Sequence, residues 1–194
     1  MKAVIFDCFG VLTTERWLEF LAGLPKGVDV DQVRSVHHAY TTGMISQQVC
    51  AQQIYDLSGQ RFAESEDKGE ATKNTALLGY IRELRVRGYK IGILSNIGTT
   101  WITDTFLTKE EQKLFDGMVL SFEAGMIKPD PRIFMLVCER LGVDPEQALL
   151  VDDIDRYCMA AQSVGMQAIV YKNFKQVKSE IEKILAAQQN DSAG

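Results

Sequence analysis

The chain has 194 residues, 46% of them hydrophobic and 24% charged, and a formal net charge of −5. This length and composition are typical of one globular core domain with room for a small insertion. The acidic balance, without a basic patch, argues against nucleic acid and anionic membranes as partners.

The cysteines and the N-terminus indicate the compartment. Four cysteines are scattered without a C-x-x-C pair, which is typical of reduced thiols in a cytosolic protein and not of a zinc site or a disulfide framework. The first residues begin directly in a strand pattern, so we expect no signal peptide. No stretch reaches about 18 apolar residues, so we also expect no membrane span. The sequence therefore predicts a cytoplasmic protein.

The first predicted strand ends in a carboxylate. Residues 3–6 are all apolar, Asp7 follows them, and the chain turns at Gly10. A buried carboxylate is unfavourable unless it is paired with a cation or holds a metal. Asp7 alone is equally consistent with a helix cap or a turn, so its interpretation depends on the rest of the chain.

Residues 14–75 interrupt the strand pattern. Helical spacing predicts three helices there, over residues 17–21, 30–40 and 46–57. Ser46 is suited to the N-cap of the third helix, and the polar stretch 64–70 predicts an exposed loop or hinge. We interpret residues 14–75 as a helical cap inserted into a core domain of residues 1–13 and 76–194. Inserted helices beside a site can form a lid.

The remaining chain alternates between strand and helix patterns. Apolar runs with polar ends predict buried strands over residues 90–94, 117–120, 148–151 and 167–171. Helical spacing predicts helices over residues 77–84, 131–141, 156–164 and 177–185. Asp130 followed by Pro131 is a good helix start, and Gly142 is a good stop. The polar tail 188–194 is expected to fray.

This alternation predicts a three-layer α/β fold, in which helices cover both faces of a Rossmann-like parallel sheet. In such sheets the ligand site lies at the carboxyl ends of the strands. Asp7, Ser95 and the pair Asp152 and Asp153 each follow or end a predicted strand. Three strands therefore deliver polar side chains to one edge, which turn chemistry alone does not explain.

Four landmarks occur in order along the chain: residues 7–12 (DCFGVL), 94–96 (LSN), 125–131 (GMIKPDP) and 151–153 (VDD). Each is a weak signal alone. In this order, with a helical insert in the first gap, they resemble the haloacid dehalogenase-like hydrolase superfamily, in the subclass with a small helical cap between the first and second motifs. The resemblance covers nearly the whole chain, and it implies a hydrolase with a Rossmann-like core and an inserted cap.

The resemblance also implies roles for particular residues. Asp7 would be the nucleophile that forms a covalent aspartyl intermediate. Ser95 and Asn96 would donate hydrogen bonds to the transferred phosphoryl group, while Lys128 would hold the nucleophile and neutralise developing charge. The substrate pocket would also include two residues close to the nucleophile in sequence, Cys8 and Gly10.

A magnesium cofactor follows from the same resemblance. A hard divalent ion takes oxygen ligands from a few carboxylates, with water and phosphate completing its coordination. The protein ligands would be the carboxylate of Asp7, the backbone carbonyl of Phe9 and the carboxylate of Asp153. Asp152 would lie behind these ligands, paired with Lys128.

Each of these residues also has an ordinary structural explanation. Ser95 and Asn96 are suited to a turn after a strand. Lys128 is suited to an exposed loop, and Asp152 and Asp153 are suited to a helix cap. These coincidences would have to occur together, so we prefer the functional interpretation.

Phe9 departs from the family pattern. The phosphatases usually carry a second Asp two residues after the nucleophile, which protonates the leaving group and later activates water. Phenylalanine can do neither, although its backbone carbonyl can still bind a metal. General acid–base catalysis typically contributes about 10²–10⁴-fold. We therefore expect slow turnover of alkyl phosphates and a smaller effect on acyl or aryl phosphates.

Two other functions stay open at this point. Dehalogenases of the family also lack the second Asp, because a halide leaves without a proton. However, the acids at 152 and 153 suit a cation and would repel a carboxylate-bearing haloacid. A binding or regulatory module without turnover could also retain Asp7, Lys128 and Asp153. We favour metal-dependent hydrolysis of a small phosphorylated metabolite.

Three further residues carry weaker hypotheses. His37 or His38, in the insert, could replace the missing acid. Neighbouring helical residues point about 100° apart, so at most one of them would face the site. Arg156 is interpreted as a helix-start residue and not as a ligand-binding residue.

Overall fold

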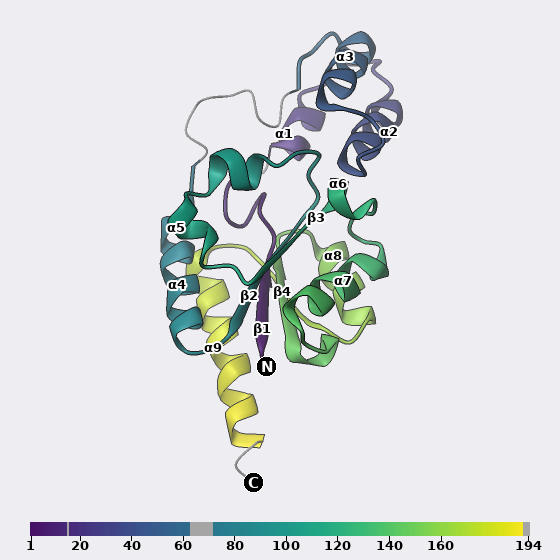
Figure 1. Cartoon of the computed structure of the whole chain (residues 1–194). Helices are drawn as coiled ribbons and strands as arrows, with labels where there is room; N and C mark the ends of the chain where they lie inside the picture. The colour runs from purple at the N-terminus through teal and green to yellow at the C-terminus, as the bar shows by residue number, and fades with distance from the viewer. Residues whose placement is uncertain (15, 63–71, 192–194) are drawn as a thin grey trace.

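The fold is built on one parallel sheet of five strands, as the computed structural model in Figure 1 shows. The structure describes residues 1–14, 16–62 and 72–191, so the stretch 64–70, expected to be a loop or hinge, lies outside the described residues. The strand order is β3-β2-β1-β4-β5. The strands are β1 (Ala3–Phe6), β2 (Lys90–Ser95), β3 (Gly117–Leu120), β4 (Ala148–Asp152) and β5 (Gln167–Val170). All five were expected from the apolar runs, and the predicted α/β fold is confirmed.

The strand register brings the polar strand ends together. Phe6 of β1 pairs with Val151 of β4 and with Ile93 of β2. Asp7, one residue further, is therefore beside Asp152, and its backbone N–H donates to the carbonyl of Val151 at 2.9 Å. β1 and β4 are buried along their whole length, which is why their sequences are almost entirely apolar.

Helices cover both faces of the sheet (Figure 1). On one side lie α4 (Thr75–Val86) and α9 (Phe174–Asp191), and on the other lie α7 (Pro131–Leu141) and α8 (Asp155–Ser163). Alternate residues of β1 serve the two layers: Val4 and Phe6 belong to the apolar cluster under α4 and α9, and Ala3 and Ile5 to the cluster under α7 and α8. This alternation follows from the two-residue period of a strand.

Three helix ends expected from the sequence are confirmed. The side chain of Asp130 accepts from the backbone N–H of Arg132, and Gly142 ends α7 in the left-handed conformation with φ +63°. Ser46 caps α3 (Gln47–Ser58) by accepting from the backbone N–H of Val49 at 3.3 Å. Local side-chain chemistry therefore fixes these helix ends.

Several elements were missed or misjudged. The sequence patterns did not predict the short elements η1 (Ile102–Phe106, a π-helical turn), α5 (Lys109–Gln112), α6 (Ser121–Ala124) and η2 (Pro145–Gln147, a 3₁₀ turn). The expectation that the tail frays from residue 188 is wrong over 188–191, because α9 continues to Asp191. Alanine and glutamine at 186–189 are good helix formers, which outweighs their polarity. Residues 192–194 lie outside the described part.

The helical insertion after β1 is present. It contains α1 (Trp17–Ala22), α2 (Val30–Thr41) and α3, at the top of Figure 1. These helices form an apolar cluster of their own, centred on the buried residues Val33, Tyr40, Cys50, Ile54 and Phe62. A separate cluster suits a cap that can move relative to the core. The boundaries 14–75 stay a prediction.

The two ends of the insertion are joined at Asn74. Its backbone N–H donates to the carbonyl of Leu12 at 2.9 Å, and its side-chain amide donates to the carbonyl of Val11 at 3.0 Å. The same amide also donates to the hydroxyl of Tyr171 at 2.7 Å. The segments where the chain leaves the core and returns to it are thus hydrogen-bonded to each other and to the core.

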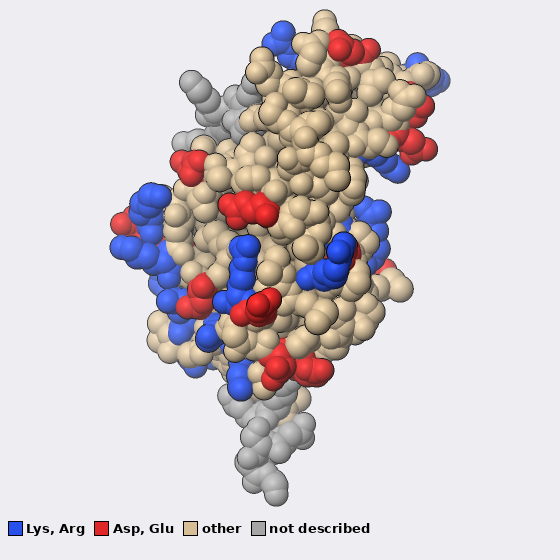
Figure 2. All heavy atoms as spheres, turned by 45° about the vertical axis from the view of Figure 1, so that its right-hand side comes forward, with Lys and Arg blue, Asp and Glu red and all other residues tan. Residues whose placement is uncertain are grey.

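Two further expectations from the sequence, on the cysteines and on membrane-spanning helices, can be compared with the structure. All four cysteines lie in the described part of the chain, where they are buried and form no disulfide. None of the helices in the described part of the chain combines the length and the apolarity that crossing a bilayer requires. Acidic and basic side chains are interspersed on the face drawn in Figure 2.

Candidate active site

A buried ammonium group connects the ends of two strands. The Nζ of Lys128 lies 2.9 Å from Oδ2 of Asp7 and 2.6 Å from Oδ2 of Asp152. The side chains of Lys128 and Asp152 are completely buried, and that of Asp7 is 8% exposed. The loop between α6 and α7 delivers Lys128 to the carboxyl edge of the sheet. The structure therefore brings together three residues that are far apart in the sequence.

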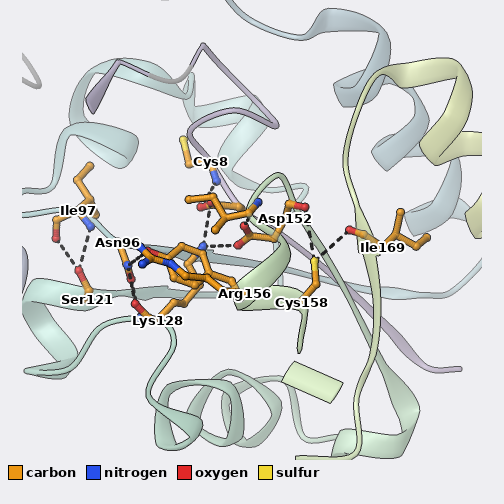
Figure 3. A network of polar contacts seen from close by, with 12 residues as sticks. Cys8, Asn96, Ile97, Ser121, Lys128, Asp152, Arg156, Cys158 and Ile169 are labelled. Carbon is orange, nitrogen blue, oxygen red and sulfur yellow. Dashed lines mark hydrogen bonds and ion pairs between the residues drawn. The ribbon is translucent and has the colours of Figure 1, made fainter. Parts of the chain in front are cut away.

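Asn96 holds the Lys128 loop in place. Its side-chain Oδ1 accepts from the backbone N–H of Lys128 at 2.8 Å, and its Nδ2 donates to the carbonyl of the same residue at 3.1 Å. Nδ2 also lies 3.4 Å from the hydroxyl of Tyr157. Figure 3 shows Asn96, Lys128, Asp152 and Cys8 in one network of polar contacts. A two-point amide contact of this kind fixes the position of Lys128 relative to β2.

Asp7 is held from both sides. Its Oδ1 accepts from the backbone N–H of Cys8 at 2.6 Å, and its Oδ2 contacts Lys128. Burial raises the pKa of the Asp7 carboxyl well above its ordinary value, and the charges of Asp152 and Asp153 act in the same direction against the attraction of Lys128. Burial also opposes the charge of Lys128, but Asp152 and Asp7 outweigh it, so the pKa of Lys128 is raised. The site therefore has more negative charge than one ammonium group offsets.

Three carboxylates at the sheet edge fit a divalent cation. Asp7, Asp152 and Asp153 each offer an oxygen atom, and these atoms lie within 4.8 Å of one another. With Lys128 the group has a formal charge of −2, which a hard divalent ion would neutralise. Gly10 has φ +78°, and a Cβ at this position would lie 2.2 Å from Oδ2 of Asp153. Only glycine leaves room here for the Asp153 carboxylate.

Ser95 presents a buried polar atom at the end of β2. Its residue is 0% exposed, and within residues 1–14, 16–62 and 72–191 its hydroxyl has no hydrogen-bond partner. Buried hydroxyl groups are normally paired, so this group can serve a bound ligand. The predicted roles of Ser95, Cys8, Gly10 and the carbonyl of Phe9 stay predictions.

A cavity of about 360 Å³ separates the core from the insertion. The core contributes Asp7, Phe9, Asn96, Ile127, Lys128, Ile154, Arg156 and Tyr157 to its lining. The insertion contributes Arg16, Trp17, Leu18, Leu21, Arg34, His37, Thr41 and Phe62. A volume near the lower end of the usual range for ligand pockets, about 300–1,000 Å³, fits a small molecule.

Four of the site residues proposed from the sequence line this cavity: Asp7, Phe9, Asn96 and Lys128. The others, namely Cys8, Gly10, Ser95, Asp152 and Asp153, lie outside its lining. Of the two histidines considered, His37 lines the cavity, stacked on Trp17 at 3.7 Å between ring centroids. Whether it takes part in proton transfer stays a hypothesis.

Five polar residues of the cavity lining were not assigned to the site from the sequence: Arg16, Arg34, Thr41, Arg156 and Tyr157. Arg156 does begin a helix, as expected, but it also lines the cavity and donates to the hydroxyl of Tyr157 at 3.1 Å. The sequence position of Arg156, three residues after Asp153, could have indicated that it lies near the site, because the first turn of α8 directly follows the end of β4. For Arg16 and Arg34 the sequence gives no comparable signal.

Comparison with known proteins supports the interpretation of the landmarks. Residues 1–165 match the family model of haloacid dehalogenase-like hydrolases. Acyl-CoA dehydrogenase family member 10 of Mus musculus is 32% identical over 105 residues, which are 54% of this chain and 10% of that protein. Phosphatase MT3486 of Mycobacterium tuberculosis (strain CDC 1551 / Oshkosh) is 25% identical over 205 aligned positions, covering 96% of this chain and 94% of that protein.

Among solved structures, a haloacid dehalogenase-like enzyme of Bacteroides thetaiotaomicron, in complex with magnesium and inorganic phosphate, matches with a TM-score of 0.62 and 22% identity. The match covers 89% of this chain and 94% of that one. The chain thus spans a small part of the mouse protein and nearly all of the other two.

Proposed function

The chain belongs to the haloacid dehalogenase-like hydrolases, and from that premise we propose that it is a magnesium-dependent phosphatase acting on a small phosphorylated metabolite. The observation that carries this proposal is the buried contact of Asp7, after β1, with Lys128, beside two further carboxylates at the carboxyl end of β4. The similarity to a mycobacterial phosphatase over almost the full chain supports the same reaction class.

In the proposed reaction, a carboxylate oxygen of Asp7 attacks the phosphorus of the substrate. The ester O–P bond breaks, and its electron pair leaves with the ester oxygen. The resulting aspartyl phosphate is then hydrolysed by water, which restores the carboxylate and releases inorganic phosphate. Lys128 orients Asp7 through the 2.9 Å contact and offsets negative charge that develops on the phosphoryl oxygens.

The residues that would hold magnesium are Asp7, Asp153 and the carbonyl of Phe9, with Asp152 paired to Lys128 behind them. The space that Gly10 leaves for the Asp153 carboxylate supports this assignment. When bound, the ion would neutralise the excess negative charge of the carboxylates and of the phosphoryl group. Asn96 acts indirectly, by holding the backbone of Lys128.

Phe9 sets the expected substrate preference. Its ring lines the cavity and stacks on Trp101 at 5.7 Å between centroids, so an apolar face occupies the position where the family's phosphatases usually carry an acid. Poor leaving groups need a proton as the ester bond breaks, and phenylalanine has none to give. We therefore propose that the enzyme favours activated esters, with acyl or aryl leaving groups, over alkyl phosphates.

A panel of alkyl phosphates, aryl phosphates and haloacids, assayed with and without magnesium, tests the proposal. We expect phosphate release from aryl phosphates only in the presence of the metal. Chloride release without added metal would instead identify a dehalogenase. Ligand binding without turnover of any compound would identify a binding module.

The nucleophile is tested by Asp7→Asn, which keeps the size of the side chain but removes its negative charge. We expect loss of more than about 10³-fold in kcat, because the covalent route is closed. Asp56→Asn, on the exposed surface of α3 and outside the cavity lining, is the matched control and is expected to retain wild-type activity. Full activity of folded Asp7→Asn would refute the mechanism.

A further inference from the structure

The first turn of α8 brings a tyrosine hydroxyl to the reacting side of the cavity. Tyr157 lines the cavity together with Asp7, Asn96 and Lys128, although it belongs to none of the four sequence landmarks. The residue is 7% exposed, so its polar atom must find its partners in the protein or in the cavity. The contacts of this hydroxyl therefore indicate what it binds.

The oxygen of the Tyr157 hydroxyl accepts two hydrogen bonds from the protein. A guanidinium nitrogen of Arg156 donates to it at 3.1 Å, and Nδ2 of Asn96 donates to it at 3.4 Å. A tyrosine hydroxyl also has one hydrogen of its own to donate. In the part of the chain that the structure describes, this hydrogen has no acceptor. It is therefore available to an acceptor in the cavity.

Two cations hold the ring of Tyr157 in position. The Nζ of Lys128 lies 5.0 Å from the ring centroid, and the guanidinium carbon of Arg156 lies 4.9 Å from it. Both distances are within the range of cation–π attraction, about 6 Å. Figure 3 shows Arg156 beside Asn96 and Lys128 in the same polar network. The hydroxyl is thus held in place before any ligand binds, which lowers the cost of ordering it on binding.

A phosphoryl oxygen is the acceptor that fits this hydrogen. The Nζ of Lys128, against which the ring of Tyr157 packs, lies 2.9 Å from Oδ2 of Asp7. Reacting atoms in a productive complex are about 3–3.5 Å apart, so a phosphorus atom attacked by Asp7 lies on the Lys128 side of the cavity. An ionised phosphoryl group offers acceptors only, and both Lys128 and the Tyr157 hydroxyl offer donors there.

Resting on the proposed phosphatase function, we infer that Tyr157 is a further substrate-binding residue, whose hydroxyl donates a hydrogen bond to an oxygen of the transferred phosphoryl group. Arg156 and Asn96 occupy the oxygen of the hydroxyl and so direct its hydrogen to the ligand. The hydroxyl keeps this hydrogen throughout the reaction. Its contribution is to bind the phosphoryl group and to orient it for attack by Asp7.

Tyr157→Phe tests the inference, because it removes the hydroxyl and keeps the ring that packs against Lys128. The full chain is used with magnesium, and inorganic phosphate is the ligand probe, since its binding needs no turnover. We expect the Kd for phosphate, measured by calorimetry, to rise about tenfold, the usual weight of a hydrogen bond to a charged group. The kcat/KM for phenyl phosphate should fall by a similar factor. Tyr55→Phe, the same substitution at an exposed residue of α3 outside the cavity lining, is the matched control and should change neither value.

A second measurement separates binding of the ligand from a merely structural role. If Tyr157 only held Asn96 and Lys128 in place, its hydroxyl would act through Asp7, and Tyr157→Phe would also weaken magnesium binding in the absence of phosphate. We expect the Kd for magnesium to stay at the wild-type value. Weaker magnesium binding, or unchanged phosphate binding, would overturn the inference while hydrolysis of phenyl phosphate by the wild type stands. Phosphate binding that depends on Tyr157, in a wild type that does not hydrolyse the ester, would support the inference and remove the phosphatase.

Discussion

At the scale of single residues, Lys128 has both a structural and a chemical task. It is fully buried and contacts the carboxylates of Asp7 and Asp152 at 2.9 and 2.6 Å. A buried charge is tolerated only while its partners stay in place, so the three side chains depend on one another. The same dependence keeps Asp7 in one orientation, which a nucleophile requires.

Phe9 is the residue whose replacement changes the reaction most directly. Phe9→Asp restores an acid two residues after Asp7, so we expect the rate with an alkyl phosphate to rise about 10–100-fold relative to an aryl phosphate. The measurement is the ratio of kcat/KM for the two esters. Phe9→Leu, which removes the ring without adding an acid, is the control and should leave alkyl turnover low. An unchanged ratio in folded Phe9→Asp would contradict this explanation.

At the scale of elements, the insertion packs closely on the core at the end of α2. The hydroxyl of Ser121, at the start of α6, donates to the carbonyl of Thr41 at the end of α2 at 2.6 Å. A Cβ on Gly98 would lie 2.2 Å from the ring of Tyr40, and a Cβ on Gly43 would lie 2.6 Å from the carbonyl of Phe122. The end of α2 therefore docks where glycine leaves space.

Gly98→Ala tests this docking. The added methyl group must displace the buried ring of Tyr40, so we expect the free energy of unfolding to fall by about 1–3 kcal/mol and KM to rise. Gly79→Ala is the matched control, because a Cβ on this residue of α4 meets no atom within 4 Å. It should raise the free energy of unfolding by about 0.5–1 kcal/mol. Urea unfolding of both variants checks the opposite signs.

The contact between α9 and α4 should make the free energy of unfolding depend on pH. Glu182 accepts from the hydroxyl of Tyr80 at 2.7 Å and from the guanidinium of Arg87 at 2.6 Å. The hydrogen bond from Arg87 lowers the pKa of Glu182 in the folded chain. A lowered folded-state pKa means that the stabilisation is fully present above the ordinary glutamate value of about 4.3 and is lost as the pH falls through the folded-state value.

Glu182→Gln should therefore destabilise the protein more at pH 7 than at pH 3. The side chains of Arg87 and Glu182 are 36% and 41% exposed, so we expect a difference below about 1 kcal/mol at pH 7. Chemical unfolding at the two pH values measures it. The same difference at both values would mean that packing, and not the charge of Glu182, is responsible.

The regular elements were largely predictable because their signals are local. The buried strands have apolar runs, and Asp130, Gly142 and Ser46 mark helix ends through contacts within a few residues. The π-helical turn η1 and the short helix α6 were not predictable, because they have neither a complete apolar period nor a strong cap. Their form depends on packing against distant residues, such as the contact of Ser121 with Thr41.

The site residues that follow a strand end could be predicted from the sequence, and most of the others could not. The spacing of the landmarks brought Asp7, Lys128 and Asp152 into one hypothesis, and the structure places them in contact. The contact of Asn96 with the phosphoryl group stays a prediction, and its amide also binds the backbone of Lys128, a contact that no sequence pattern reveals. Arg16 and Arg34 reach the cavity only because the insertion folds over the core.

At the scale of the whole molecule, the architecture separates chemistry from recognition. The sheet delivers carboxylates and a cation to one edge, and the insertion supplies the facing wall of the cavity. The core and the insertion have separate apolar clusters, so the amino-acid sequence of the insertion can change without disturbing the reacting residues of the core. The hydrogen bonds of the Asn74 side chain hold the end of the insertion against the core.

The excess negative charge at the sheet edge predicts how the whole molecule responds to magnesium. Carboxylates of Asp7, Asp152 and Asp153 repel one another in the metal-free chain, and a bound divalent ion removes that repulsion in the folded state only. At a magnesium concentration of about 100 times Kd, binding should add about 2.7 kcal/mol to the free energy of unfolding. For a chain of this size that is a rise in Tm of about 5–10 °C, measured by thermal unfolding with and without chelator.

Asp153→Asn should abolish the magnesium-dependent rise in Tm, because it removes one charged ligand while keeping the shape of the side chain. Asp155→Asn, two residues further along on the exposed start of α8 and outside the acidic group, should keep the rise. A rise that persists in Asp153→Asn would place the metal elsewhere, and no rise in the wild type would remove the metal from the proposal. Because Tm is measured without substrate, this result distinguishes a chain that cannot bind the ion from one that binds it and fails in catalysis.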